Sequence, residues 1–163
     1  MRTREIALSA VFSALYATLV VSLSPISFGP LQLRIADAII PLAMVFGWPV
    51  VAGVTLGCFV ANVYGQLGLL DYVLGPAANL IAATLFYKLR QHPLLACSVG
   101  PLPIGLIVGG YLWTFFPPPE VLALPMWLAM MVSVTVSTYV VVGLVGFVLY
   151  KSVYRILGHK KTI

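Results

Sequence analysis

Residues 50–64 read VVAGVTLGCFVANVY, an apolar run that contains no charged side chain. Five similar runs share the chain with it, separated by Pro, Gly or charged residues. The six runs cover Ile6–Leu23, Ile35–Phe46, Val50–Tyr64, Tyr72–Tyr87, Pro101–Phe116 and Leu124–Tyr150. Of the 163 residues 61% are hydrophobic and 8% are charged, and the mean hydropathy of +1.07 lies outside the range of soluble domains. The composition predicts an all-α membrane protein, a six-transmembrane-helix bundle in which residues 1–163 form one domain.

The second run, Ile35–Phe46, is shorter than the others. A helix needs roughly 20 residues to cross a bilayer, and this run has too few. We therefore expect it to be extended, tilted or set among the other helices.

The basic residues predict how the chain is oriented. All but one of the nine Lys and Arg residues lie before the first run, between the fourth and fifth runs, or after the sixth. Lys and Arg concentrate in cytoplasmic loops, so an even number of spans places both the N and C termini in the cytoplasm. The formal charge of +5 is explained by this topology and requires no nucleic-acid partner.

Motifs for catalysis, cofactors and metals are missing from the sequence. Cys58 and Cys97 have neither paired spacing nor neighbouring metal ligands, which predicts no disulfide and no metal site. The sequence contains no GxxxxGK[ST] phosphate loop, no HExxH and no GxSxG. We therefore expect a non-catalytic protein without a cofactor, one that cannot hydrolyse ATP by itself.

Three of the four acids join the remaining basic residue, Arg34, near the predicted outer ends of the helices. Charges near a membrane are costly unless they are solvated or paired, so these groups predict a small pocket that opens outward. For Glu120 the alternative is a solvated loop acid, and for Asn62 it is an amide that bridges two helices. The candidate substrate-binding residues are Gln32, Arg34, Asp37, Asn62, Asp71, Asn79 and Glu120.

Spacing along the helices refines this set. If a helix begins near Leu33, Arg34 and Asp37 face the same way and can pair with each other or with a ligand. Asp71 directly precedes the fourth run, where it can cap the helix, and capping and ligand binding can coexist. Asp71, Gly75 and Asn79 recur at four-residue spacing and should share one inward face.

Small residues form two stripes along predicted helices. One stripe in the first run includes Ala10 and Ala14, and the other, in the third run, consists of Gly53, Gly57 and Ala61. Such stripes let another helix approach closely, so each serves either internal packing or a partner protein. The first run remains a candidate for a partner surface.

Three segments together resemble the QueT family, the queuosine-precursor substrate-binding (S) components of energy-coupling-factor (ECF) transporters. They are LQLRIADAIIP (31–41), FGWPVVAGVTLGCFVANVYG (46–65) and LLDYVLGPAANLIAATLFYKL (69–89). The six spans and the AxxxA spacing from Ala10 to Ala14 are also similar to S components in general.

The resemblance implies a subunit in the cell membrane of a prokaryote that captures a 7-deazaguanine, such as the aminomethyl or cyano precursor of queuosine, from outside. It would then dock on a transmembrane coupling protein, EcfT, and two cytoplasmic ATPases would drive release inward. The acids would bind the guanine-like edge or a cationic aminomethyl group, and Ala10 and Ala14 would face the coupling protein. A stand-alone carrier, or an S component for a different vitamin or nucleobase, is the competing hypothesis.

Overall fold

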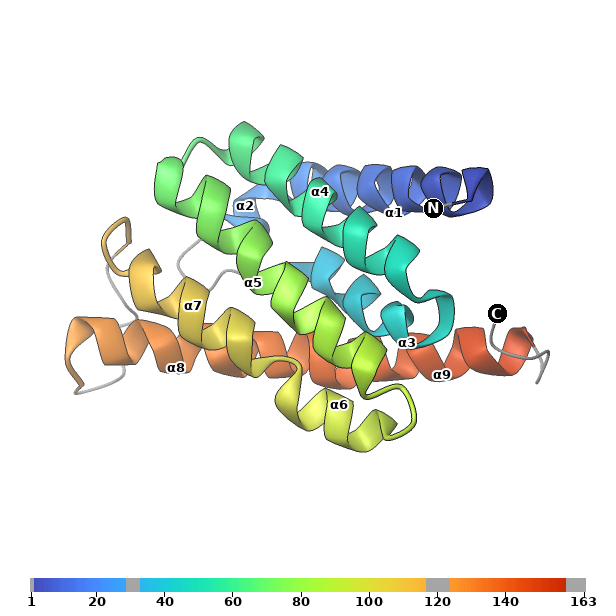
Figure 1. Ribbon diagram of the computed structural model, residues 1–163. Coiled ribbons are helices and arrows are strands. Elements are labelled where there is room, and N and C mark those ends of the chain that lie inside the picture. Colours follow the sequence, from blue (N-terminus) through green and yellow to red (C-terminus); the bar gives the residue numbers. More distant parts are fainter. Residues whose placement is uncertain (1, 29–32, 117–123, 158–163) are drawn as a thin grey trace.

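The computed structural model describes residues 2–28, 33–116 and 124–157, and its regular elements in these ranges are all helical (Figure 1). The elements are α1 (Thr3–Ser22), α2 (Ser24–Ser27), η1 (Ile35–Leu42), α3 (Ala43–Phe46), α4 (Trp48–Gly65), α5 (Leu69–Lys88), α6 (Pro93–Val99), α7 (Leu102–Leu112), α8 (Met126–Thr138), η2 (Tyr139–Val145) and α9 (Gly146–Ile156).

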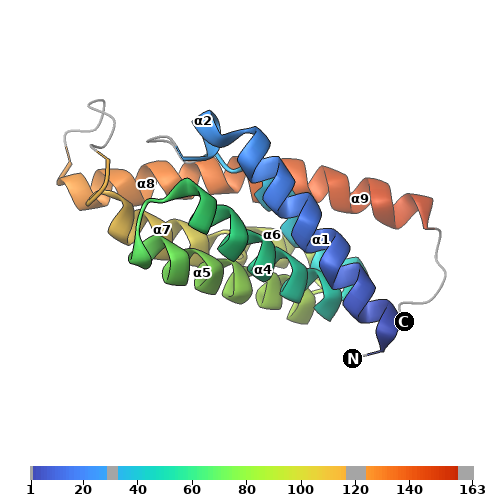
Figure 2. The same ribbon diagram turned by 90° about the horizontal axis from the view of Figure 1, so that it is seen from above.

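Within the described residues, five helical stretches are long and apolar enough to cross a membrane. They are Thr3–Ser22, Trp48–Gly65, Leu69–Lys88, Pro93–Leu112 and Met126–Ile156. The chain is therefore a multi-pass, all-helical membrane protein. Both ends of the described chain lie at one end of the bundle in Figures 1 and 2, whereas the count of six spans and the cytoplasmic side stay predictions.

The short second run is helical and lies among the longer helices. It forms the 3-10 helix η1, which continues into α3, and every residue of η1 except Ile35 is buried. Of the three expectations for this run, a place among the other helices is the one confirmed. Pro41 lies inside η1 and packs against α9. A Cβ added to Gly146 of α9 would be 2.8 Å from Cγ of Pro41.

The predicted fifth run was placed too late in the sequence. The span begins at Pro93 instead of Pro101, and its helix ends at Leu112 instead of Phe116. Gly100 and Pro101 both have right-handed helical torsions, so the chain passes from α6 into α7 without turning back. Proline is tolerated in the first turn of a helix because its missing N–H has no partner there.

Helices α1 and α4 pack with their backbones close together. A Cβ on Gly53 would be 2.6 Å from Phe12 Cβ, and a Cβ on Gly57 would be 2.6 Å from the Ser13 carbonyl oxygen. The stripe on α4 therefore serves internal packing. The stripe on α1 does not, because Ala10 and Ala14 are exposed on its outer side.

Candidate functional site

A buried polar cluster joins five helical elements, namely α1, η1, α4, α5 and α7. It contains Arg34, Asp37, Asn62, Asp71 and Asn79, each of which is at most 5% exposed. Three further residues complete the buried polar cluster: Tyr16, Cys58 and Tyr111. Two other candidates, Gln32 and Glu120, lie outside the described residues. Five of the seven predicted binding residues are thus brought together.

One half of the cluster surrounds the carboxylate of Asp37 on η1. The hydroxyl of Tyr16, from α1, donates a hydrogen bond to Asp37 Oδ1 at 2.5 Å. Asn79 Nδ2, from α5, donates to Tyr16 Oη at 2.8 Å and lies 3.4 Å from Asp37 Oδ1. Neutral donors from α1 and α5 thus hold the carboxylate of Asp37 on η1 in place.

The other half surrounds Asp71 in the first turn of α5. Tyr111 Oη, from α7, donates to Asp71 Oδ1 at 2.6 Å, and Arg34 Nη2 lies 3.5 Å from the same oxygen. Asn62 Nδ2, from α4, donates to the backbone carbonyl of Asp71 at 2.7 Å. Asn62 therefore bridges α4 and α5, and it lies beside Asp71, another of the candidate binding residues. Cys58 Sγ is 3.5 Å from Arg34 Nη1 on another side of the guanidinium.

Of the two alternatives for Arg34 and Asp37, a pair with each other or contact with a ligand, the structure does not show the first, because Arg34 forms its ion pair with Asp71. Arg34 precedes η1 and has φ −81° and ψ 89°, which is not helical. Residues three apart share a face only when both are in the helix, so the spacing rule does not apply here.

The alternative role of Asp71, capping the helix, is likewise not what the structure shows. Helix α5 begins at Leu69, its N-cap residue is Gly68, and no side chain caps it. Asp71 is the third residue of the helix, and its carboxylate faces Tyr111 and Arg34. The shared face of Asp71, Gly75 and Asn79 is confirmed, since all three are buried.

Three atoms of the Asp71 half have no hydrogen-bond partner in the described structure. They are Arg34 Nε, Asn62 Oδ1 and Asp71 Oδ2. Leaving one buried polar group unpaired costs about 1–3 kcal/mol, and more when the group is charged. Buried polar groups in proteins are normally satisfied, so these three atoms give contacting residues hydrogen-bonding capacity that the described side chains do not use.

The surroundings of these atoms are shaped by an aromatic ring and a glycine. Arg34 Cζ lies 5.6 Å from the ring centre of Phe28, a distance at which the guanidinium is attracted to the ring face. Gly75 faces Asn62, and a Cβ at this position would overlap the Nδ2 atom of that amide. Glycine at position 75 therefore leaves room for the bridge between α4 and α5.

The chemistry of the cluster suits recognition of a polar ligand. It offers two carboxylates, two amides, two phenols and one guanidinium in an apolar interior. Among the residues that the structure describes, no three His, Cys, Asp or Glu side chains are grouped so that they could hold a metal ion. Hydrogen bonding and charge pairing are what this set can provide.

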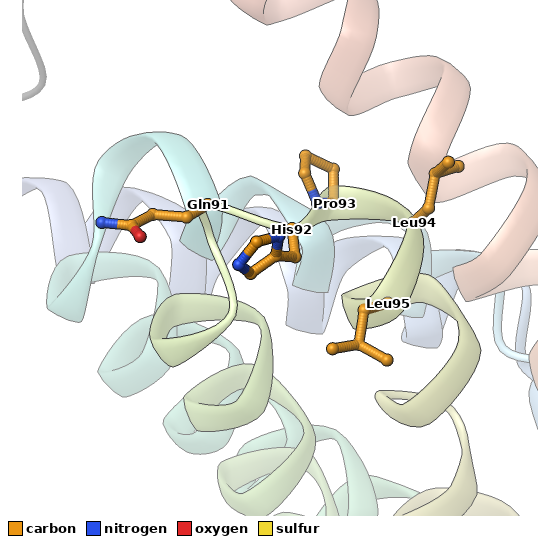
Figure 3. Close-up of a pocket in the computed structure, with 5 residues that line it drawn as sticks. All are labelled: Gln91, His92, Pro93, Leu94 and Leu95. Carbon is orange, nitrogen blue, oxygen red and sulfur yellow. The ribbon is translucent and has the colours of Figure 1, made fainter.

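A surface hollow of about 480 Å³ lies elsewhere, at the turn between α5 and α6 (Figure 3). Its lining consists of Gln91, His92, Pro93, Leu94 and Leu95. Asp71 lies at the opposite end of α5, and a helix rises about 1.5 Å per residue, so the two places are roughly 25–30 Å apart along the bundle. The hollow has no carboxylate in its lining and does not adjoin the buried polar cluster.

Sequence reasoning did not select Tyr16, Cys58 or Tyr111 as binding residues. The signal for Tyr16 was present, because a tyrosine in the middle of an apolar span buries a hydroxyl that needs a partner. Tyr16 is completely buried, and its hydroxyl meets that need through Asp37 and Asn79.

A comparison with protein families gives one match that spans most of the chain. A family model described as QueT transporter matches residues 6–155. No curated protein and no solved structure matches the chain significantly.

Proposed function

The chain belongs to the QueT transporter family, and on that premise we propose that it is the S component of an ECF-type importer. In this role it binds a 7-deazaguanine, such as the aminomethyl or cyano precursor of queuosine, from outside the cell. Its family assigns it to transport, and ATP hydrolysis belongs to partner subunits.

The observation that carries this proposal is the buried polar cluster. Arg34 and Asp71 are 5% and 0% exposed in a bundle whose other interior side chains are mostly apolar. Burying an ion pair in an apolar interior costs more free energy than packing apolar side chains there. A functional role therefore explains the Arg34–Asp71 pair better than a contribution to stability does. Binding a polar molecule in an apolar membrane protein is such a use.

A 7-deazaguanine matches the composition of the cluster. Its pyrimidine ring presents a carbonyl oxygen, an N–H and an amino group along one edge. The carboxylates and amide oxygens of the cluster accept hydrogen bonds, and the guanidinium donates them. An aminomethyl substituent adds a cation, for which the second carboxylate, Asp37, is available. Gln32 and Glu120 remain predicted contributors that lie outside the described residues.

The proposed partners are a transmembrane coupling protein, EcfT, and two cytoplasmic ATPases. The exposed side of α1 supports this part of the proposal, since Ala10 and Ala14 lie there and no other described part of the chain buries them. Small residues on an exposed helix face permit close approach of a second helix. The proposed location is the cell membrane of a prokaryote.

Calorimetry on the purified chain in detergent tests the proposal. Aminomethyl and cyano 7-deazaguanine serve as ligands, and guanine, thiamine and riboflavin serve as controls. We expect dissociation constants in the low micromolar range or below for a deazaguanine alone. Tight binding of thiamine or riboflavin, with none of a deazaguanine, would contradict the proposed substrate.

A further inference from the structure

The three residues that carry the unpaired atoms of the Asp71 half follow an order that is set by contacts. Asp71 lies between the other two residues, because Arg34 Nη2 approaches its carboxylate and Asn62 Nδ2 binds its backbone carbonyl. The unpaired atoms are Nε on Arg34, Oδ2 on Asp71 and Oδ1 on Asn62. Read from Arg34 to Asn62, they form a donor, an acceptor and a second acceptor.

The orientation of the Asn62 amide follows from its partner. The Asp71 carbonyl can only accept a hydrogen bond, so the nitrogen of the amide must face it. The oxygen of the same amide is therefore an acceptor that points away from that carbonyl. Gly75 leaves space for this orientation, as a Cβ there would overlap Nδ2.

We propose that Arg34, Asp71 and Asn62 together read the lactam and amino edge of the ligand. This assignment rests on the proposed function and names its specificity residues. A guanine-type edge presents, in order, an oxygen that accepts, a ring N–H that donates and an amino group that donates. Arg34 Nε binds the oxygen, Asp71 Oδ2 binds the ring N–H, and Asn62 Oδ1 binds the amino group.

The Asp37 half of the cluster differs from the Asp71 half in its hydrogen bonding. Asp37 Oδ1 already accepts a hydrogen bond from Tyr16, with Asn79 Nδ2 close by. None of the buried unpaired side-chain atoms in the described structure belongs to these three residues. This half therefore does not read the edge, and it is the part of the cluster left for a substituent.

The same pattern rejects other purine-like edges. A 7-deazaxanthine presents a carbonyl where guanine has its amino group, so two acceptors would meet at Asn62 Oδ1. A 7-deazahypoxanthine has only a hydrogen at that position and leaves the amide oxygen unpaired. A site built to bind a polar group discriminates strongly against analogues that lack it.

The test is calorimetry with 7-deazaguanine and 7-deazahypoxanthine, which differ only in the amino group. For the unaltered chain we expect the amino group to improve the dissociation constant at least about 10-fold. The substitution Asn62→Leu should reduce this preference to within about twofold, because leucine has a similar size and no acceptor. The Gly110→Ala variant is the matched control and should keep the preference, since nothing lies within 4 Å of a Cβ there.

A second variant separates the two carboxylates. Asp71→Asn should weaken both ligands by a similar factor of at least about 10, because both present the ring N–H to the lost charge. Asp37→Asn should change the affinity for aminomethyl 7-deazaguanine more than the affinity for unsubstituted 7-deazaguanine. The reverse result, with Asp37 controlling the unsubstituted ligand, would overturn the assignment.

The outcomes distinguish this assignment from the proposed function. If the unaltered chain binds no deazaguanine, the proposed function fails and the assignment falls with it. If the unaltered chain binds 7-deazaguanine and 7-deazahypoxanthine equally well, only the assignment fails. That comparison requires no substitution, so it decides the matter even where a variant does not fold.

Discussion

Replacing Gly57 by alanine should separate α1 from α4 and weaken the fold. The new Cβ would lie 2.6 Å from the Ser13 carbonyl oxygen and 2.9 Å from Tyr16 Cβ. Ordinary contact begins at 3.4 Å, so the neighbouring backbone must retreat by about 0.8 Å. Overpacking of this kind costs about 1–3 kcal/mol. The upper half of this range applies because the atom that the new Cβ meets belongs to the backbone of Ser13. Alanine regains up to about 1 kcal/mol of helix propensity, which leaves a net loss of about 1–2 kcal/mol.

Thermal unfolding in detergent, followed by circular dichroism, measures this loss. A destabilisation of that size lowers the midpoint by roughly 2–8 °C for a chain of this length. The control is Gly110→Ala, an exposed helical glycine where a Cβ meets nothing within 4 Å, and it should be neutral or slightly stabilising. Because Tyr16 moves with α1, Gly57→Ala should also weaken ligand binding. Equal midpoints for the two variants would refute the close approach of α1 and α4.

Three further substitutions test other contacts. Tyr111→Phe removes the 2.6 Å hydrogen bond to Asp71 and should lower the free energy of unfolding by about 1–2 kcal/mol, as measured by thermal unfolding; an unchanged midpoint would contradict that bond. Gly75→Ala should displace the Asn62 amide and weaken 7-deazaguanine binding about 5- to 50-fold by calorimetry, whereas unaltered affinity would show that the amide is not needed. Ala14→Leu should leave ligand binding intact but reduce co-purification with the coupling protein, and full co-purification would remove this face from the interface.

The helices could be predicted because their signals are local. Hydropathy alone located each long span, including Val50–Tyr64 inside α4, although the predicted ends differ from those in the structure. The largest error was at Pro101, which reads as a break although the helical torsions of Gly100 carry the chain through it. Proline and glycine mark such positions, but they do not say whether the chain turns back or continues.

The sequence predicted which residues belong to the site but not how they pair. Polar residues in an apolar chain are conspicuous, so Asp37, Asp71 and Asn79 stood out by composition. The pairing of these residues did not follow from the sequence, because Arg34 reaches Asp71 through a tertiary contact across 37 positions of sequence. Tyr111 likewise meets Asp71 across 40 positions, and no periodicity of a single helix reports such a contact.

A structure of the chain with 7-deazaguanine bound tests the central claim most directly. The account predicts that the heterocycle lies within the buried polar cluster and that its lactam and amino edge contacts Arg34, Asp71 and Asn62. Ligand bound elsewhere, for instance in the hollow beside His92, with the cluster still closed on itself, would contradict the account.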